Sequence, residues 1–317
     1  MPDVLAVSVV IPLYNKGPHI ARAIQSVLNQ TEQSFEIIVV DGQSTDEGPK
    51  ILKSLKDQRI FFYEQVGSGV SSARNEGVCH SKSDFIAFLD ADDEWMPDHL
   101  ETLLRLCGTY PEAGVYTTAY LIRYPNFRIE VANFHAVPEK PWEGLLPSYF
   151  KSAAFGDPPI WTSVVGIPKR ILEEMGGFNT EAWWGEDTDL WGRIALKYPI
   201  AFSWNIGAMY HTEAVNRIPH RVMAVKENPF ITTVKEYLAM QEVSPELLRD
   251  LYAYVDKKRV ETAVINVRSG CLSLARQQLL SCRSRSITTK WFKVFILTLL
   301  PQSIVTWLLT ARQRMAL

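Results

Sequence analysis

The first hundred residues alternate between two kinds of hydrophobic pattern. Residues 4–11 form an unbroken run rich in β-branched side chains, which is typical of a strand covered on both faces. Over residues 20–28 the apolar side chains recur every three or four positions, as on one face of a helix. The same order returns, with strands expected at 36–40, 59–64 and 85–89 and helices at 49–55 and 70–78. This alternation predicts an α/β fold with a mostly parallel central sheet.

Charge and cysteine content limit the classes of function. The 317 residues include 33 basic and 35 acidic side chains, so the net charge of −2 gives no reason to expect nucleic-acid binding. Four widely spaced cysteines without a CxxC pair argue against a disulfide framework or a structural zinc site. No basic segment precedes the first apolar run, so we expect no secretory signal peptide and a cytoplasmic location.

Carboxylates gather where the predicted strands end. Ligands of such sheets bind beyond the carboxyl ends of the strands, where this chain has Tyr14, Asp41 and the cluster Asp90, Asp92 and Asp93. Three carboxylates within four residues repel one another unless a cation compensates them, and Mn²⁺ and Mg²⁺ both accept oxygen ligands. The cluster therefore predicts a metal site. The alternative is that Asp92 and Asp93 only begin a helix near residue 97.

Five short motifs follow one another at the edges of these elements. They are VVIPLYN at 9–15, IVVDGQSTD at 38–46, GVSSARN at 69–75, FLDADD at 88–93 and GEDTDLW at 185–191. In order and spacing, from about residue 7 to residue 211, the set resembles the family-2 inverting glycosyltransferases of the GT-A fold. The resemblance implies a GT-A catalytic domain at 1–220, with a nucleotide-binding half at 1–106 and an acceptor half at 107–220. A helical C-terminal region at 221–317 would follow.

The resemblance implies a site for a nucleotide-sugar donor, with UDP as the expected nucleotide. Tyr14 would stack on the base, Pro12 would shape the turn that carries it, and Asp41 would line the pocket for base and ribose. Many relatives have a second acid in this last turn that meets the uracil, whereas this chain has Gly42.

The same resemblance places the diphosphate and its cation. Arg74 would approach the phosphates, and the alternative is a solvated arginine on a helix face. Asp90 would bind the ribose or a metal-bound water, Asp92 would ligate Mn²⁺ or Mg²⁺ directly, and His211 would lie near the metal. The cation would neutralise the charge that builds up on the leaving nucleoside diphosphate.

The acceptor side is expected around residues 176–191. By the same resemblance, Asp187 would be the base that takes the proton from the acceptor hydroxyl, and Gly177, Glu186 and Trp191 would line the acceptor site. Adjacent acids among tryptophans should raise the pKa of a carboxylate toward a useful range, and Gly177 suggests a positive φ or a close backbone approach. The alternative is that Glu186 and Asp187 only supply acids to the first turn of a helix that carries Trp191.

Residues 291–309 are almost wholly apolar. Lys293 and a central Pro301 interrupt the stretch, so a helix that spans a membrane is not favoured. Basic residues flank it, namely Arg283, Arg285, Lys290, Arg312 and Arg314. We expect peripheral contact with a membrane surface through residues 283–314, and the alternative is a helical hairpin packed on protein.

Together these features predict a metal-dependent inverting glycosyltransferase. It would move a sugar from a nucleoside-diphosphate sugar to a hydroxyl of a saccharide or a lipid-linked saccharide, in the assembly of a cell-surface polysaccharide. A non-catalytic carbohydrate-binding or scaffold protein of the same fold is the alternative, although such a protein needs neither Asp92 nor Asp187. A nucleotidyltransferase would want a Gly-rich basic loop after the first strand, where this chain supplies only Lys16 and Gly17.

Overall fold

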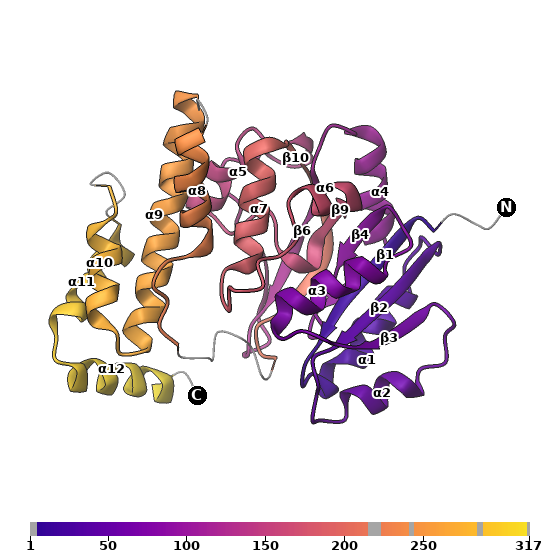
Figure 1. The fold of residues 1–317 in the computed structure, drawn as a ribbon, viewed down its shortest axis with the longest axis horizontal. Coiled ribbons are helices and arrows are strands. Elements are labelled where there is room, and N and C mark those ends of the chain that lie inside the picture. The colour runs from indigo at the N-terminus through magenta and orange to yellow at the C-terminus, as the bar shows by residue number, and fades with distance from the viewer. Residues whose placement is uncertain (1–4, 215–222, 241–243, 284–287, 316–317) are drawn as a thin grey trace. The chain divides into compact units, whose positions relative to one another are not determined.

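A computed structural model describes residues 5–214, 223–240, 244–283 and 288–315. The chain forms two compact units, Met1–Asn216 and Arg217–Leu317, which can be followed by colour in Figure 1. The domain boundary expected between residues 220 and 221 lies outside the described residues and stays a prediction.

The first unit is built on a sheet with the strand order β3-β2-β1-β4-β9-β6-β10-β5. Six strands run in the same direction: β1 (Val7–Leu13), β2 (Phe35–Asp41), β3 (Ile60–Glu64), β4 (Phe85–Phe88), β6 (Val115–Arg123) and β10 (Ile200–His211). Strand β9 (Val165–Pro168) is antiparallel between β4 and β6. Three short strands add antiparallel pairs, namely β5 (Glu94–Trp95), β7 (Ile129–Val131) and β8 (Glu143–Leu145). The predicted α/β fold with a mostly parallel sheet is confirmed.

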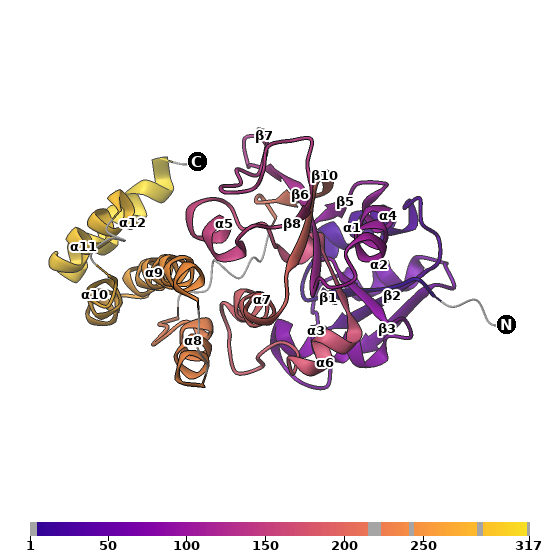
Figure 2. The same ribbon diagram turned by 90° about the horizontal axis from the view of Figure 1, so that it is seen from above.

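Helices cover both faces of this sheet. Figure 2 shows α1 (Gly17–Leu28) and α4 (His99–Thr109) on one face, and α3 (Gly69–His80), α6 (Lys169–Glu174) and α7 (Glu186–Lys197) on the other. The first unit also contains α2 (Gly48–Ser54), α5 (Tyr149–Phe155) and the short helix η1 (Thr162–Val164). The segment 138–159, whose composition suggests a long loop, thus contains β8 and α5.

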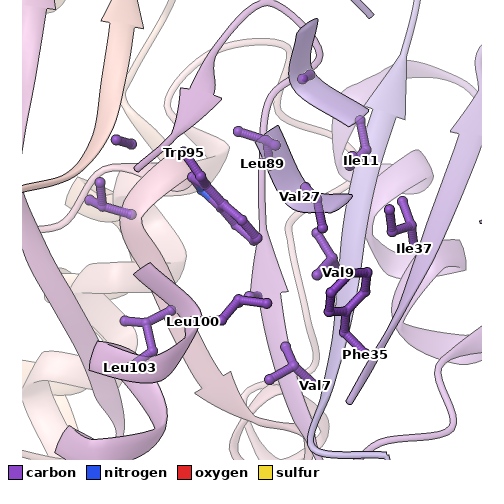
Figure 3. Packing of buried hydrophobic residues seen from close by; sticks show 14 of the residues in the cluster. Val7, Val9, Ile11, Val27, Phe35, Ile37, Leu89, Trp95, Leu100 and Leu103 are labelled. Atoms are coloured by element: carbon purple, nitrogen blue, oxygen red, sulfur yellow. The ribbon is translucent and has the colours of Figure 1, made fainter. Parts of the chain in front are cut away.

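The main core lies between β1 and helices α1 and α4. Alternate residues of β1 face it, because successive side chains of a strand point to opposite faces of the sheet. Figure 3 shows Val7, Val9 and Ile11 of β1 packed with Val27 of α1 and Leu100 of α4. The opposite face of the sheet packs on α3, where Ile38 and Val40 of β2 contact Ala73.

The second unit is helical. It contains α8 (Pro229–Met240), α9 (Pro245–Arg268), α10 (Leu272–Leu280), α11 (Thr289–Leu299) and α12 (Gln302–Met315). Helix α9 begins at Pro245, and the Ser244 hydroxyl caps it by accepting a hydrogen bond from the Leu247 amide. The core of the second unit includes Ala263 of α9, Leu279 of α10 and Trp291 of α11. Among the described residues, no helix is both long enough and apolar enough to cross a bilayer.

Candidate active site

The loops that follow β1 and β2 are tied to each other by hydrogen bonds from backbone amides to side-chain oxygens. The Asn15 amide donates to the Ser44 hydroxyl over 2.9 Å, and the Thr45 amide donates to Asn15 Oδ1 over 2.8 Å. Two residues after Asn15, the Gly17 amide donates to Asp46 Oδ2 over 2.8 Å. These bonds fix the turn that carries Tyr14, whose ring is half exposed at the edge of the sheet.

The space beside Gly42 is filled by a side chain from the neighbouring strand end. A Cβ atom at Gly42 would lie 2.8 Å from Gln65 Oε1 and 3.5 Å from the ring of Tyr14. Gln65 Nε2 donates to the Gly69 carbonyl over 2.8 Å, so its oxygen is held toward Gly42. Asp41 is buried, and its carboxylate accepts from the Ser44 amide over 3.2 Å. A side chain at position 42 would therefore have to displace the Gln65 amide.

Arg74 is a buried residue of α3 that joins two acids from distant parts of the chain. Its guanidinium donates to Asp90 Oδ1 over 2.8 Å and to Glu186 Oε1 over 3.1 Å. Its charged end also lies over the Phe178 ring, 5.1 Å from the ring centroid. Arg74 is therefore not a solvated arginine on a helix face, and it links the end of β4 to the start of α7.

Asp93 is a buried structural acid. Its carboxylate accepts from the Ser163 hydroxyl over 2.7 Å and from the His211 amide over 3.1 Å, which ties β4 to η1 and to the end of β10. Burial raises the pKa of Asp93 well above its ordinary value, and the neighbouring Asp92 and Asp90 raise it further. The idea that Asp93 only begins a helix is wrong, because β5 follows it and α4 begins at His99.

Asp92 is held by cations of α1 and of the loop before it. Its carboxylate forms an ion pair with the Lys16 ammonium, with Nζ 2.6 Å from Oδ2. The Arg22 guanidinium donates to the Asp92 carbonyl and lies 3.9 Å from a carboxylate oxygen of Glu94. In this structure the charge of Asp92 is thus compensated by a lysine.

His211 ends β10 and is buried between two carboxylates. Its Nε2 lies 3.0 Å from Glu94 Oε1 and its Nδ1 lies 2.9 Å from Glu213 Oε1. The hydrogen bond from His211 is the main cause that lowers the pKa of Glu94. Both ring nitrogens thus face carboxylates, so Nε2 can ligate a cation only after it separates from Glu94 and carries no proton.

The adjacent acids at the start of α7 lie in different surroundings. Glu186 is buried, and burial together with the charge of Asp187 raises its pKa to about 7, against the opposing attraction of Arg74. The expected raised carboxylate pKa is thus found at Glu186. Asp187 is only partly buried, and its carboxylate accepts from the Thr188 amide over 2.6 Å. Both acids do lie in the first turn of a helix, as the alternative interpretation states.

The loop before α7 is fastened to α3 by Asn75. Its side-chain amide donates to the Phe178 carbonyl, and its Oδ1 accepts from the Phe178 amide, both over 2.8 Å. Gly177 has a φ of 70°, and a Cβ atom there would lie 2.6 Å from Asn75 Oδ1, so both reasons for a glycine are confirmed. Trp191 is 1% exposed and packs on Phe178, so its assignment to the acceptor surface is wrong. It is a core residue of α7.

The model of the family described as Glycosyl transferase family 2 matches residues 8–174. This match covers more than half of the chain and contains the first four motifs. The chain belongs to glycosyl transferase family 2. An uncharacterized glycosyltransferase of Rickettsia conorii is 30% identical over 202 residues, which are 61% of this chain. The aligned part is 31% of that relative, so the chain spans about a third of its length.

Two solved structures have the same GT-A fold as this family 2 chain. The TarS 1–349 structure from S. aureus, in complex with UDP-GlcNAc, has a TM-score of 0.68 at 14% identity and covers 89% of this chain and 82% of its own. The mannosyltransferase PcManGT from Pyrobaculum calidifontis, in complex with GDP-Man and Mn²⁺, has a TM-score of 0.58 at 16% identity and covers 99% and 87%. At these identities the likeness concerns the fold.

Asp92 and His211 have side chains of the types that bind divalent cations. Asp92 offers hard oxygen atoms and His211 an imidazole, and Mn²⁺ accepts both types. Within the described ranges, no three His, Cys, Asp or Glu side chains are grouped as they would be around an ion. Two protein ligands suffice where substrate phosphates supply the others, so the pair fits a cation that arrives with its donor.

Four residues of this site escaped the sequence interpretation: Lys16, Gln65, Asn75 and Glu94. Lys16, Asn75 and Glu94 lie inside or directly beside a motif, whereas Gln65 lies four residues before one and has no local signal. Their roles depend on contacts with other loops, as between Lys16 and Asp92 or between Asn75 and Phe178.

Proposed function

We propose that this chain is an inverting glycosyltransferase. It transfers a sugar from a nucleoside-diphosphate sugar, with UDP as the nucleotide, to a hydroxyl of a saccharide or a lipid-linked saccharide in cell-surface polysaccharide assembly. The observation that carries the proposal is the Arg74 bridge, which joins the acids of the nucleotide-side strand ends to the acids that begin α7. Donor-side and acceptor-side chemistry thus meet at one buried guanidinium.

The donor side is assigned to the first two strand ends. The half-exposed ring of Tyr14 stacks on the base, with Pro12 in the turn and Asp41 lining the base and ribose pocket. Gln65 presents an oxygen beside Gly42 because its amide nitrogen already donates to the Gly69 carbonyl. An acceptor atom there suits a base that offers an N–H donor, such as uracil N3–H.

The diphosphate is assigned to Arg74, Asp90 and Asp92. Asp90 is the more exposed acid of the Arg74 pair, so it is the one that can reach the ribose or a metal-bound water. Asp92 and His211 would hold Mn²⁺ or Mg²⁺ once Lys16 and Glu94 release them. When bound, the cation neutralises the charge that develops on the leaving diphosphate.

Asp187 is assigned as the base. Neighbouring residues of a helix point about 100° apart, so Glu186 turns inward to Arg74 while the partly buried Asp187 remains able to meet an acceptor. Asp187 takes the proton of the acceptor hydroxyl while the oxygen of that hydroxyl bonds to the anomeric carbon. The bond from that carbon to the phosphate oxygen breaks, and the nucleoside diphosphate leaves with the electron pair.

Two measurements test the proposal. Turnover of a panel of nucleotide sugars by the purified chain, with Mn²⁺ or Mg²⁺, separates a transferase from a carbohydrate-binding protein without activity. Asp187→Asn should keep donor affinity and lose transfer by about 10²-fold or more, because general-base catalysis contributes at least this much. Glu181→Gln removes an exposed carboxylate from the same segment and serves as the matched control. Equal loss of donor binding and turnover in Asp187→Asn would rule out its role as base.

A further inference from the structure

Helix α11 is apolar on two opposite sides. Trp291, Val294 and Thr298 are buried, and the Trp291 indole donates to the Leu279 carbonyl over 3.0 Å. On the other side, Phe292 and Ile296 are each 55% exposed, one helical turn apart. A surface helix of a globular protein normally turns polar residues outward, so this second apolar side requires an explanation.

Helix α12 also exposes apolar side chains. Val305 is buried in the core of the second unit, whereas Ile304, Trp307 and Leu308 are exposed, Trp307 by 68%. We call the exposed apolar side chains of α11 and α12 the apolar face, and its members are Phe292, Ile296, Leu299, Ile304, Trp307 and Leu308.

All the charged side chains of the C-terminal segment 262–317 are basic. Residues 262–317 contain no aspartate or glutamate and eight basic side chains. Because the whole chain has a net charge of −2, residues 1–261 carry the remaining −10. Lys290 and Lys293 are exposed on the same helix as Phe292 and Ile296. Basic residues beside exposed aromatic and aliphatic residues match the surface of a bilayer that contains anionic lipids.

We propose that the apolar face binds the surface of an anionic bilayer, with α11 and α12 lying in the interface. Helix α11 has 11 residues and is about 16 Å long, which is half the thickness of the hydrocarbon core, so it lies along the surface and does not cross it. The apolar side chains enter the boundary of head groups and acyl chains, while the lysines meet the lipid phosphates. A second copy of this chain is a poorer occupant, since it would bring two strongly basic segments together.

Vesicle flotation of the full chain tests this proposal. Vesicles of phosphatidylcholine with a quarter of phosphatidylglycerol are compared with pure phosphatidylcholine, at low and at high salt. The chain should float with the anionic vesicles at least tenfold better, and salt should weaken the binding. Lys290→Gln with Lys293→Gln should lower the partition roughly 25-fold, at about fivefold for each lysine. Lys50→Gln with Lys53→Gln on α2 is the matched control.

The apolar contribution is tested by Phe292→Ser with Ile296→Ser, which should lower the partition at least tenfold. Because both side chains are exposed, the melting temperature of this variant should stay within 2 °C or so of the parent. Phe155→Ser, at an exposed phenylalanine of the first unit, is its control. Failure of the parent chain to float would overturn the proposal, as would equal loss in the control. A dimer in solution that the double variant dissociates would instead assign the apolar face to a second copy.

Discussion

Replacing Glu186 by glutamine should stabilise the first unit at alkaline pH and leave it nearly unchanged at acid pH. The wild-type carboxyl is buried against Asp187, and its pKa rises to about 7 from the 4.5 that an exposed glutamate has. The folded state therefore binds this proton more tightly than the unfolded state does. Ionisation of Glu186 destabilises the fold, and the loss grows as the pH rises from about 4.5 to about 7.

The magnitude follows from these two pKa values. A carboxyl whose pKa rises from 4.5 to about 7 on folding costs about 3 kcal/mol of stability once it is ionised. This figure already contains the attraction of Arg74, which lowers the pKa and so opposes the rise. Glutamine has the shape of the protonated form and no charge. For a unit of this size, about 3 kcal/mol corresponds to a rise of roughly 6 to 12 °C in melting temperature.

Scanning calorimetry of both proteins at several values between pH 4.5 and pH 8 measures the difference. Glu186→Gln should melt with the parent near pH 4.5 and well above it at pH 8. Glu181→Gln removes an exposed carboxylate five residues away and controls for the change in net charge. A difference between Glu186→Gln and the parent that stays constant over this pH range would refute the reasoning, since it would not come from an ionisation.

Three further predictions concern single side chains of the site. Gly177→Ala should destabilise the first unit by at least about 2 kcal/mol in urea unfolding, because its Cβ meets the Asn75 amide at a positive φ. Gly176→Ala, with a similar φ and open space around it, should lose only the strain of about 1 kcal/mol, and equal losses would contradict the clash. Lys16→Met should raise the affinity of the nucleotide-free chain for Mn²⁺ about tenfold in a spin-resonance titration, because it removes a competing cation; an unchanged affinity would exclude Asp92 as a ligand. Gln65→Leu should weaken UDP binding about 5- to 30-fold by calorimetry, and an unchanged affinity would exclude Gln65 from base recognition.

The fold was largely predictable because its signal is local and repeated. Continuous apolar runs and helical spacing gave the strands and helices, and the ends of parallel strands necessarily meet at one edge of the sheet. The positive φ of Gly177 was also predictable, because glycine adopts this backbone conformation without the strain that other residues have. The acids that follow the strands could therefore be named from the sequence, but the residues that they contact could not.

The pairing of those acids was not predictable, because it depends on contacts between distant segments. Arg74 and Glu186 are 112 residues apart, and no local pattern indicates that they meet. Trp191 was misassigned for a different reason. It belongs to the apolar side of α7 with Leu190 and Ile194, and that helical spacing predicts a core position rather than an acceptor surface.

The two hydrogen bonds between Asn75 and Phe178 join segments that are 103 residues apart in the chain. Asn75 directly follows Arg74 on α3, and Phe178 lies in the loop that leads to Asp187. In the proposed function, the separation of Arg74 from Asp187 is thus held across this short bridge, and not only along the intervening chain.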